Sequence, residues 1–148
     1  RYRPHQGRPR GARQNYLEGE MIFAAVAVKK SVMLAQCVTL LTGYPEPAIQ
    51  AEWVEMPTHS IVSVATAAGL PDAIHAKAIY LPPSTIWHAP GFRDRFEAHE
   101  LTHHFQFHAG AFGKLDRVEI EREADCVEQL QPWCEDVDQS MRGYCRVR

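Results

Sequence analysis

The chain has 148 residues, of which 45% are hydrophobic and 23% charged, with a formal net charge of −2. This length and apolar content are typical of a single globular domain with its own core. The near-neutral charge excludes the strong attraction by which basic proteins bind nucleic acid or anionic membranes, so we expect no nucleic-acid partner.

The first fourteen residues form a basic segment, with five arginines, one histidine and no acidic residue. Prolines and glycines interrupt any helix there, so we expect residues 1–14 to be an extended surface arm, with a binding arm as the alternative. The folded domain is expected over 15–148. Because the first residue is Arg1 rather than methionine, we expect a fragment or a processed form, with a signal peptide or an anchor as candidates for a removed segment.

Between Tyr16 and Thr42 apolar residues recur along one broad helical stripe, which predicts a long N-terminal helix. Gly43, with prolines shortly beyond it, is a typical helix end. Lys29 and Lys30 interrupt the apolar run before it reaches the length that spans a bilayer. We therefore expect a buried helix and no transmembrane segment in this chain.

Three short apolar stretches with turn residues near their ends predict strands over 48–56, 59–66 and 74–81. They suggest a small three-stranded sheet, antiparallel or mixed, in which most of the pairing is antiparallel. The residues from Ser84 to Asp94 predict a loop, and Asp94 is a candidate cap for the helix that follows. Strands followed by helices predict an α+β fold.

The next helix is expected over 95–107 and contains the sequence His99-Glu100-Leu101-Thr102-His103. Residues four apart return to nearly the same face of a helix, so His99 and His103 can both bind one metal ion. Glu100 lies one step round the helix, where a carboxylate can take a proton from metal-bound water. An accidental match in a histidine-rich helix is the alternative.

A further helix is expected from Leu115 to Leu130, beyond Gly110 and Gly113, which can end the preceding one. It offers a third metal ligand, Glu121, and four residues later Asp125, which can accept the outer N–H of a ligand histidine. A solvated acidic face is the alternative for this stretch. The flanking acids are expected to stay solvated on the opposite side of the helix: Glu119 and Glu123.

His-Glu-x-x-His followed by Glu-x-x-Ala-Asp resembles the gluzincin clan of zinc metallopeptidases, which includes thermolysin-like enzymes and CAAX-prenyl-type membrane proteases. The resemblance covers roughly residues 96–125, about a fifth of the chain. It implies a zincin-like domain with Zn²⁺, held by His99, His103 and Glu121. It also implies that Glu100 is the general base and that Asp125 orients a ligand.

The resemblance further implies that the strand next to the active helix pairs with extended substrate, and 74–81 is the candidate by position. A metzincin would need glycine at position 106 and histidine at 109, where the chain has Gln106 and Ala109. The chain lacks the transmembrane helices of the CAAX-prenyl-type proteases, and it is much shorter than the thermolysin-like enzymes. The nearest type is a minimal, single-domain gluzincin.

The expected function is therefore zinc-dependent hydrolysis of a peptide or protein substrate. A non-catalytic zinc-binding regulatory or interaction module is the alternative, although such a module would not require Glu100. A side chain must also donate to the oxyanion that forms on the scissile carbonyl. Four residues are candidates for this donor, each with a packed aromatic or a surface histidine as the alternative: Tyr144, His108, His88 and Tyr80.

The four cysteines are an even number, which is compatible with disulfides. Three of them cluster near the C-terminus, where we expect at least one disulfide among Cys126, Cys134 and Cys145. Free buried thiols are the alternative. The expected disulfide favours a periplasmic or secreted protein over a cytoplasmic one.

Overall fold

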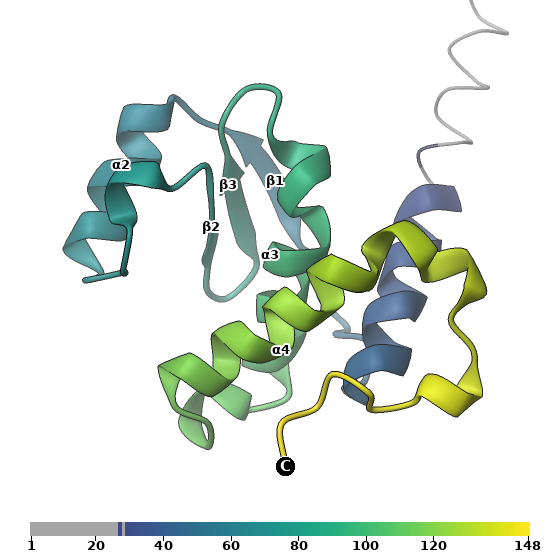
Figure 1. The fold of residues 1–148 in the computed structure, drawn as a ribbon. Helices are drawn as coiled ribbons and strands as arrows, with labels where there is room; N and C mark the ends of the chain where they lie inside the picture. The colour runs from purple at the N-terminus through teal and green to yellow at the C-terminus, as the bar shows by residue number, and fades with distance from the viewer. Residues whose placement is uncertain (1–26, 28) are drawn as a thin grey trace, which may run out of the picture. The chain divides into compact units, whose positions relative to one another are not determined.

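The computed structural model describes residue 27 and residues 29–148 (Figure 1). The residues from Met33 to Arg148 form one compact unit, and the described residues before them belong to a separate unit and are helical. The basic arm over 1–14 and the first part of the predicted N-terminal helix lie outside the described residues. Within the described part of the chain, no helix has the length and apolar character needed to cross a membrane.

The predicted N-terminal helix is present over residues 29–42. It ends where the sequence indicated, because Gly43 adopts a left-handed φ of 73° and its N–H donates to the carbonyl of Thr39 at 2.8 Å. In the compact unit, this helix contributes one buried row to the main core: Leu34, Cys37, Val38 and Leu41.

The sheet has three strands, β1 (Glu52–Glu55), β2 (Ala78–Leu81) and β3 (Thr85–His88), in the order β1-β3-β2. β3 pairs in parallel with β1 and antiparallel with β2, so the sheet is mixed rather than mostly antiparallel. Two of the predicted strands are present in shortened form. The central strand β3 lies where we expected a loop. Its four residues are too short a run for the sequence pattern to indicate a strand.

The prediction of a strand over 59–66 was wrong, because this stretch is helix α2 (Thr58–Ala67). Its β-branched residues are typical of strands. However, the two buried residues of the segment, Ile61 and Ala65, lie four apart and pack together against the sheet. A helix brings residues four apart onto one face, so it can bury this pair alone. A strand would bury the pair only together with the residue midway between them.

The α3 helix (Arg93–His108) and α2 cover opposite faces of the sheet (Figure 1). Side chains alternate along β2, so Ile79 packs with the α2 cluster while the ring of Tyr80 contacts α3 at His104. The α4 helix (Arg117–Leu130) then crosses α3 on the side away from the sheet (Figure 1). The protein is thus a small α+β domain in which α3 is the central element.

The two helices begin differently. α3 starts two residues earlier than expected, after Phe92, and the prediction of an Asp94 cap was wrong because Asp94 lies inside the first turn. α4 starts with a capping box, in which the side chain of Asp116 accepts from the N–H of Glu119 and the side chain of Glu119 accepts from the N–H of Asp116. The box defines where α4 begins.

The C-terminal segment forms two short 3₁₀ stretches, η3 (Gln131–Asp136) and η4 (Gln139–Met141). Two disulfides hold it: Cys126–Cys145, a pair within the predicted cluster, and Cys37–Cys134, which joins the segment to the first helix. The prediction of at least one disulfide among the last three cysteines is confirmed. All four cysteines of the chain are therefore paired.

Candidate metal centre

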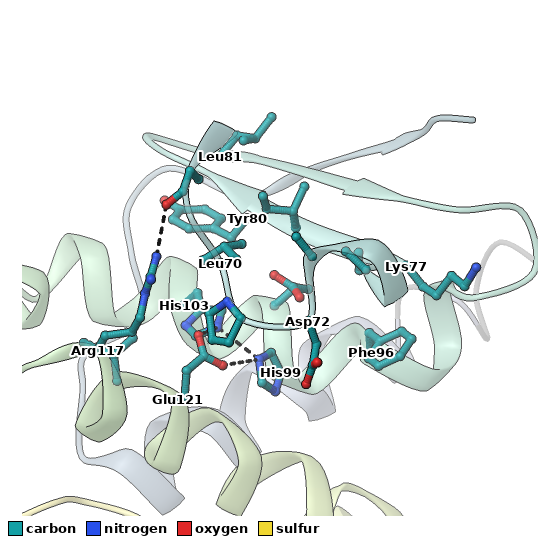
Figure 2. Close-up of a pocket in the computed structure, with 18 of the residues that line it drawn as sticks. Leu70, Asp72, Lys77, Tyr80, Leu81, Phe96, His99, His103, Arg117 and Glu121 are labelled. Carbon is teal, nitrogen blue, oxygen red and sulfur yellow. Dashed lines mark hydrogen bonds and ion pairs between the residues drawn. The ribbon is translucent and has the colours of Figure 1, made fainter. Parts of the chain in front are cut away.

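Three side chains converge at the crossing of α3 and α4 (Figure 2). The Nε2 atoms of His99 and His103 lie 3.0 Å apart, as the four-residue spacing predicted. From α4, Glu121 places Oε2 3.1 Å from Nε2 of His99 and Oε1 3.3 Å from Nε2 of His103. These three residues form a group that can hold a metal ion.

The spacing of these atoms suits a small tetrahedral cation. Ligand bonds of about 2.0–2.1 Å at tetrahedral angles place neighbouring ligand atoms about 3.4 Å apart. The separations among His99, His103 and Glu121 are 3.0 to 3.3 Å. Two imidazoles and one carboxylate would fill three of the four positions around a tetrahedral ion.

The charges of the group also favour a cation. Burial lowers the pKa of His99, but hydrogen bonds to Glu121 and Glu128 outweigh it and raise the pKa to about 10. Burial raises the pKa of Glu121, but the hydrogen bonds from His103 and His99 outweigh it and hold the pKa well below its usual range. Both shifts have one cause, because carboxylates that face the two imidazoles stabilise positive charge between them.

The other ring nitrogen of His99 faces two acids on α4. Its Nδ1 lies 3.2 Å from Oδ1 of Asp125 and 3.4 Å from Oε2 of Glu128. The predicted Asp125 is thus placed beside a candidate ligand, where an acceptor fixes the tautomer of the imidazole. Glu128 was missed, although its position seven residues after Glu121, on the same helical face, could have indicated it.

The carboxylate of Glu100 is buried beside the two histidines, with 6% of the residue exposed, and it lines the same cleft. The backbone N–H of Tyr80, on β2, donates to it. Burial raises the pKa of the Glu100 carboxyl, and the opposing effects of His103 and His99 do not cancel this rise. The acid is therefore next to the metal group without belonging to it, as the sequence indicated.

A cleft of about 890 Å³ runs past these residues, between β2 and the α2–β2 connection on one side and α4 on the other. Much of its lining is apolar and comes from residues far apart in the chain: Val64, Leu70, Ile79, Phe96, Phe112 and Leu115. Two cationic side chains also line it, Lys77 and Arg117, and no sequence pattern had singled them out. The cleft can thus accept an elongated molecule with apolar side chains.

Strand β2 is an edge strand, and its open edge borders the cleft. Ala89 donates its N–H to the carbonyl of Lys77 at 2.7 Å, so Lys77 and, by alternation, Ile79 direct their backbone groups at β3. The backbone groups of Ala78 and Tyr80 therefore point to the open edge. Of these, the N–H of Tyr80 is used by Glu100.

The four candidate donors to an oxyanion lie in different places. Tyr144 is 67% exposed, and Nε2 of His108 donates to the carbonyl of Pro83 at 2.8 Å; neither residue lines the cleft. His88 lines a smaller hollow beside Trp53. Tyr80 lines the cleft, but its hydroxyl donates to the carbonyl of Pro83 at 2.6 Å. Among the cleft-lining residues, His75 and Lys77 also carry N–H donors.

Glu119 and Glu123 do not behave as a solvated pair. Glu119 serves the capping box, while Glu123 is 0% exposed and accepts a hydrogen bond from the hydroxyl of Tyr44 at 2.7 Å. The prediction that Glu123 stays solvated was wrong, because the face of α4 that turns from the cleft packs into the core.

Comparisons with models of protein families, with curated proteins and with solved structures found no match for this chain. The function of the centre is therefore inferred from its own residues.

Proposed function

We propose that the chain is a zinc-dependent peptidase of the gluzincin type on a zincin-like fold. One observation carries the proposal: His99, His103 and Glu121 converge within 3.3 Å of one another, with the buried carboxylate of Glu100 beside them in the same cleft. A structural zinc site has no use for that fourth group and is normally closed by a fourth protein ligand. The arrangement therefore favours catalysis over a structural role.

In this proposal, separate residues hold the metal ion, transfer the proton and orient a metal ligand. His99, His103 and Glu121 would hold Zn²⁺, which supplies a Lewis acid and an activated water when bound. Glu100 accepts a proton from the attacking water at its carboxylate and passes it to the leaving amine. Its carboxylate is oriented for this by the backbone N–H of Tyr80. Oδ1 of Asp125 lies 3.2 Å from Nδ1 of His99, where a carboxylate can hold the ring with Nε2 directed at the ion.

An extended peptide suits the shape and polarity of the cleft. The open edge of β2 presents the backbone N–H and C=O of Ala78 and the C=O of Tyr80, which can add a peptide as a further strand. The apolar lining on both sides can receive alternate side chains. We therefore propose a peptide or unfolded protein segment as the substrate class.

The two disulfides bear on where the protein works. Disulfides persist in oxidising compartments and are rare in the cytosol. Because Cys37–Cys134 and Cys126–Cys145 use every cysteine of the chain, we propose a periplasmic or extracellular location.

The test is turnover of casein by the purified protein, together with elemental analysis. We expect one zinc per chain and hydrolysis that a chelator abolishes and added zinc restores. One zinc per chain without turnover would indicate a non-catalytic binding module instead. Absence of bound metal after dialysis against zinc would contradict both.

A further inference from the structure

A buried chain of hydrogen bonds runs from the metal group into the core of the domain. Nδ1 of His103 lies 2.8 Å from Oε1 of Gln106, one turn along α3. Nε2 of Gln106 donates to Oε2 of Glu123 at 3.0 Å and to the carbonyl of Ile120 at 2.9 Å. Gln106 and Glu123 are both 0% exposed, and neither lines the cleft.

Glu123 is a fully buried carboxylate that receives donors from three other parts of the chain. The hydroxyl of Tyr44 donates to Oε2 at 2.7 Å, and the N–H of Val147 donates to Oε1 at 2.9 Å. Nε of Arg146 lies 3.7 Å from Oε1 and supplies an opposite charge. A buried carboxylate is costly unless such partners surround it, so this one is well supported.

These partners fix the orientation of the Gln106 amide. A backbone carbonyl and a carboxylate can only accept hydrogen bonds, so Ile120 and Glu123 both require the NH₂ side of the amide. A flipped amide would direct its oxygen at two other acceptors. The oxygen of Gln106 must therefore face His103, where it can only accept.

An acceptor at that position determines the tautomer of His103. Nδ1 must carry the proton that it donates to Gln106, and the lone pair of the neutral ring is then on Nε2. Nε2 is the atom that faces His99 and Glu121. The acceptor that orients His103 is thus a neutral amide, whereas His99 meets the carboxylates of Asp125 and Glu128 directly.

We propose that Glu123, acting through Gln106, positions His103 as a metal ligand by selecting its Nδ1–H tautomer and holding its ring. The proposal rests on the proposed zinc site. Gln106 and Glu123 are positioning residues, since neither reaches the cleft. The consequence is that docking of residues 146–147, through Val147 and Arg146, is connected to the geometry of the metal ligand.

Two variants and one matched control test this on the full chain. Glu123→Gln keeps the size of the side chain but removes the acceptor-only group, so the Gln106 amide can reverse. Gln106→Met keeps the length of the side chain and removes all three hydrogen bonds of the amide, to His103, Ile120 and Glu123. Tyr44→Phe is the control, because it deletes another hydrogen bond to the same oxygen of Glu123 and leaves Gln106 intact. Circular dichroism establishes that each variant is folded.

The first readout is zinc affinity, measured by competition with a chromophoric chelator. We expect Glu123→Gln and Gln106→Met to lose about 10- to 100-fold, the usual effect of removing the partner of a ligand histidine. Tyr44→Phe should bind near the wild-type affinity. If all three variants lose affinity alike, the effect is general destabilisation and the proposal is wrong; unchanged affinity in Glu123→Gln and Gln106→Met also overturns it.

The second readout requires no metal. ¹⁵N-histidine NMR of the zinc-free protein should show a proton on Nδ1 of His103 in the wild type and an unprotonated Nδ1 fraction in Glu123→Gln. An unprotonated Nδ1 in the wild type would overturn the assignment of the tautomer. If the wild-type protein and the variants bind zinc equally well, only this positioning role is contradicted. If the wild-type protein binds no zinc, the proposed function and this inference are both contradicted.

Discussion

The backbone N–H of Tyr80, on the edge strand β2, donates a hydrogen bond to the buried carboxylate of Glu100, on α3. This bond joins the strand that borders the cleft to the proposed general base. It lowers the pKa of the Glu100 carboxyl, against the larger effect of burial, which raises it. The edge strand that would bind the proposed peptide and the proposed base therefore line the same cleft.

Glu100→Gln should retain zinc and lose hydrolysis of casein. The amide is nearly isosteric with the carboxylate but cannot accept a proton at neutral pH, which removes a contribution of about 10²- to 10⁴-fold to the rate. Zinc content and initial rates measured on the same preparation check this. Glu97→Gln is the matched control, because Glu97 is also buried on α3 but does not line the cleft. A Glu100→Gln protein that hydrolyses casein near the wild-type rate would exclude Glu100 as the base.

Glu121→Ala should lower zinc affinity by several orders of magnitude, while Glu119→Ala should leave it near the wild-type value. The carboxylate of Glu121 lies 3.1 and 3.3 Å from the two imidazoles, whereas that of Glu119 caps the start of α4. Titration of both purified variants with zinc checks this, and Glu119→Ala also measures the cost of losing the cap, about 1 kcal/mol of unfolding free energy. A larger loss of affinity in Glu119→Ala would mean that α4 has another register.

Removal of zinc should lower the midpoint of thermal unfolding. His99 and His103 lie on α3 and Glu121 lies on α4, so an ion that binds all three stabilises only the folded arrangement of the two helices. Thermal unfolding with and without a chelator measures the shift, and it should grow with the concentration of free zinc. The Glu121→Ala variant should show little or no shift under the same conditions.

Loss of the Cys37–Cys134 disulfide should destabilise the protein more than loss of Cys126–Cys145. The two bonds close chain segments with separations of 97 and 19 residues. Loop-closure entropy assigns about 4.7 kcal/mol to a loop near the first length and about 3 kcal/mol to one near the second. Urea unfolding of the two double alanine variants, Cys37→Ala with Cys134→Ala and Cys126→Ala with Cys145→Ala, compares them. Equal losses would show that loop length does not control their effect.

Arg117→Ala should loosen one wall of the cleft. The guanidinium donates to the carbonyl of Gly69 at 2.8 Å and to that of Ala68 at 3.3 Å, so it connects the start of α4 to the end of α2. Hydrogen–deuterium exchange should become faster in the segment that follows α2, over residues 68–76. Arg122→Ala, which changes another exposed arginine of α4, should leave this exchange unchanged.

Local sequence determined much of the helical part of the site. The four-residue spacing of His99 and His103 placed both imidazoles on one face, and the same spacing paired Glu121 with Asp125 on α4. Gly43 and Gly110 ended helices where expected, because each adopts a left-handed φ of 73° that favours glycine. These features depend on neighbours within one or two helical turns, which is why the sequence alone could indicate them.

Tertiary structure decided the remainder. The β-branched residues of 59–66 form a helix because Ile61 and Ala65 meet the sheet together, and the four residues of β3 become a strand because β1 and β2 pair with them on either side. Glu123 looks like its neighbours in an acidic stretch, yet it is buried because Tyr44, Gln106 and Val147 bring donors to it from distant parts of the chain. Burial of a polar group is costly unless other groups form hydrogen bonds with it. No local pattern in the sequence specifies which distant residues supply those groups.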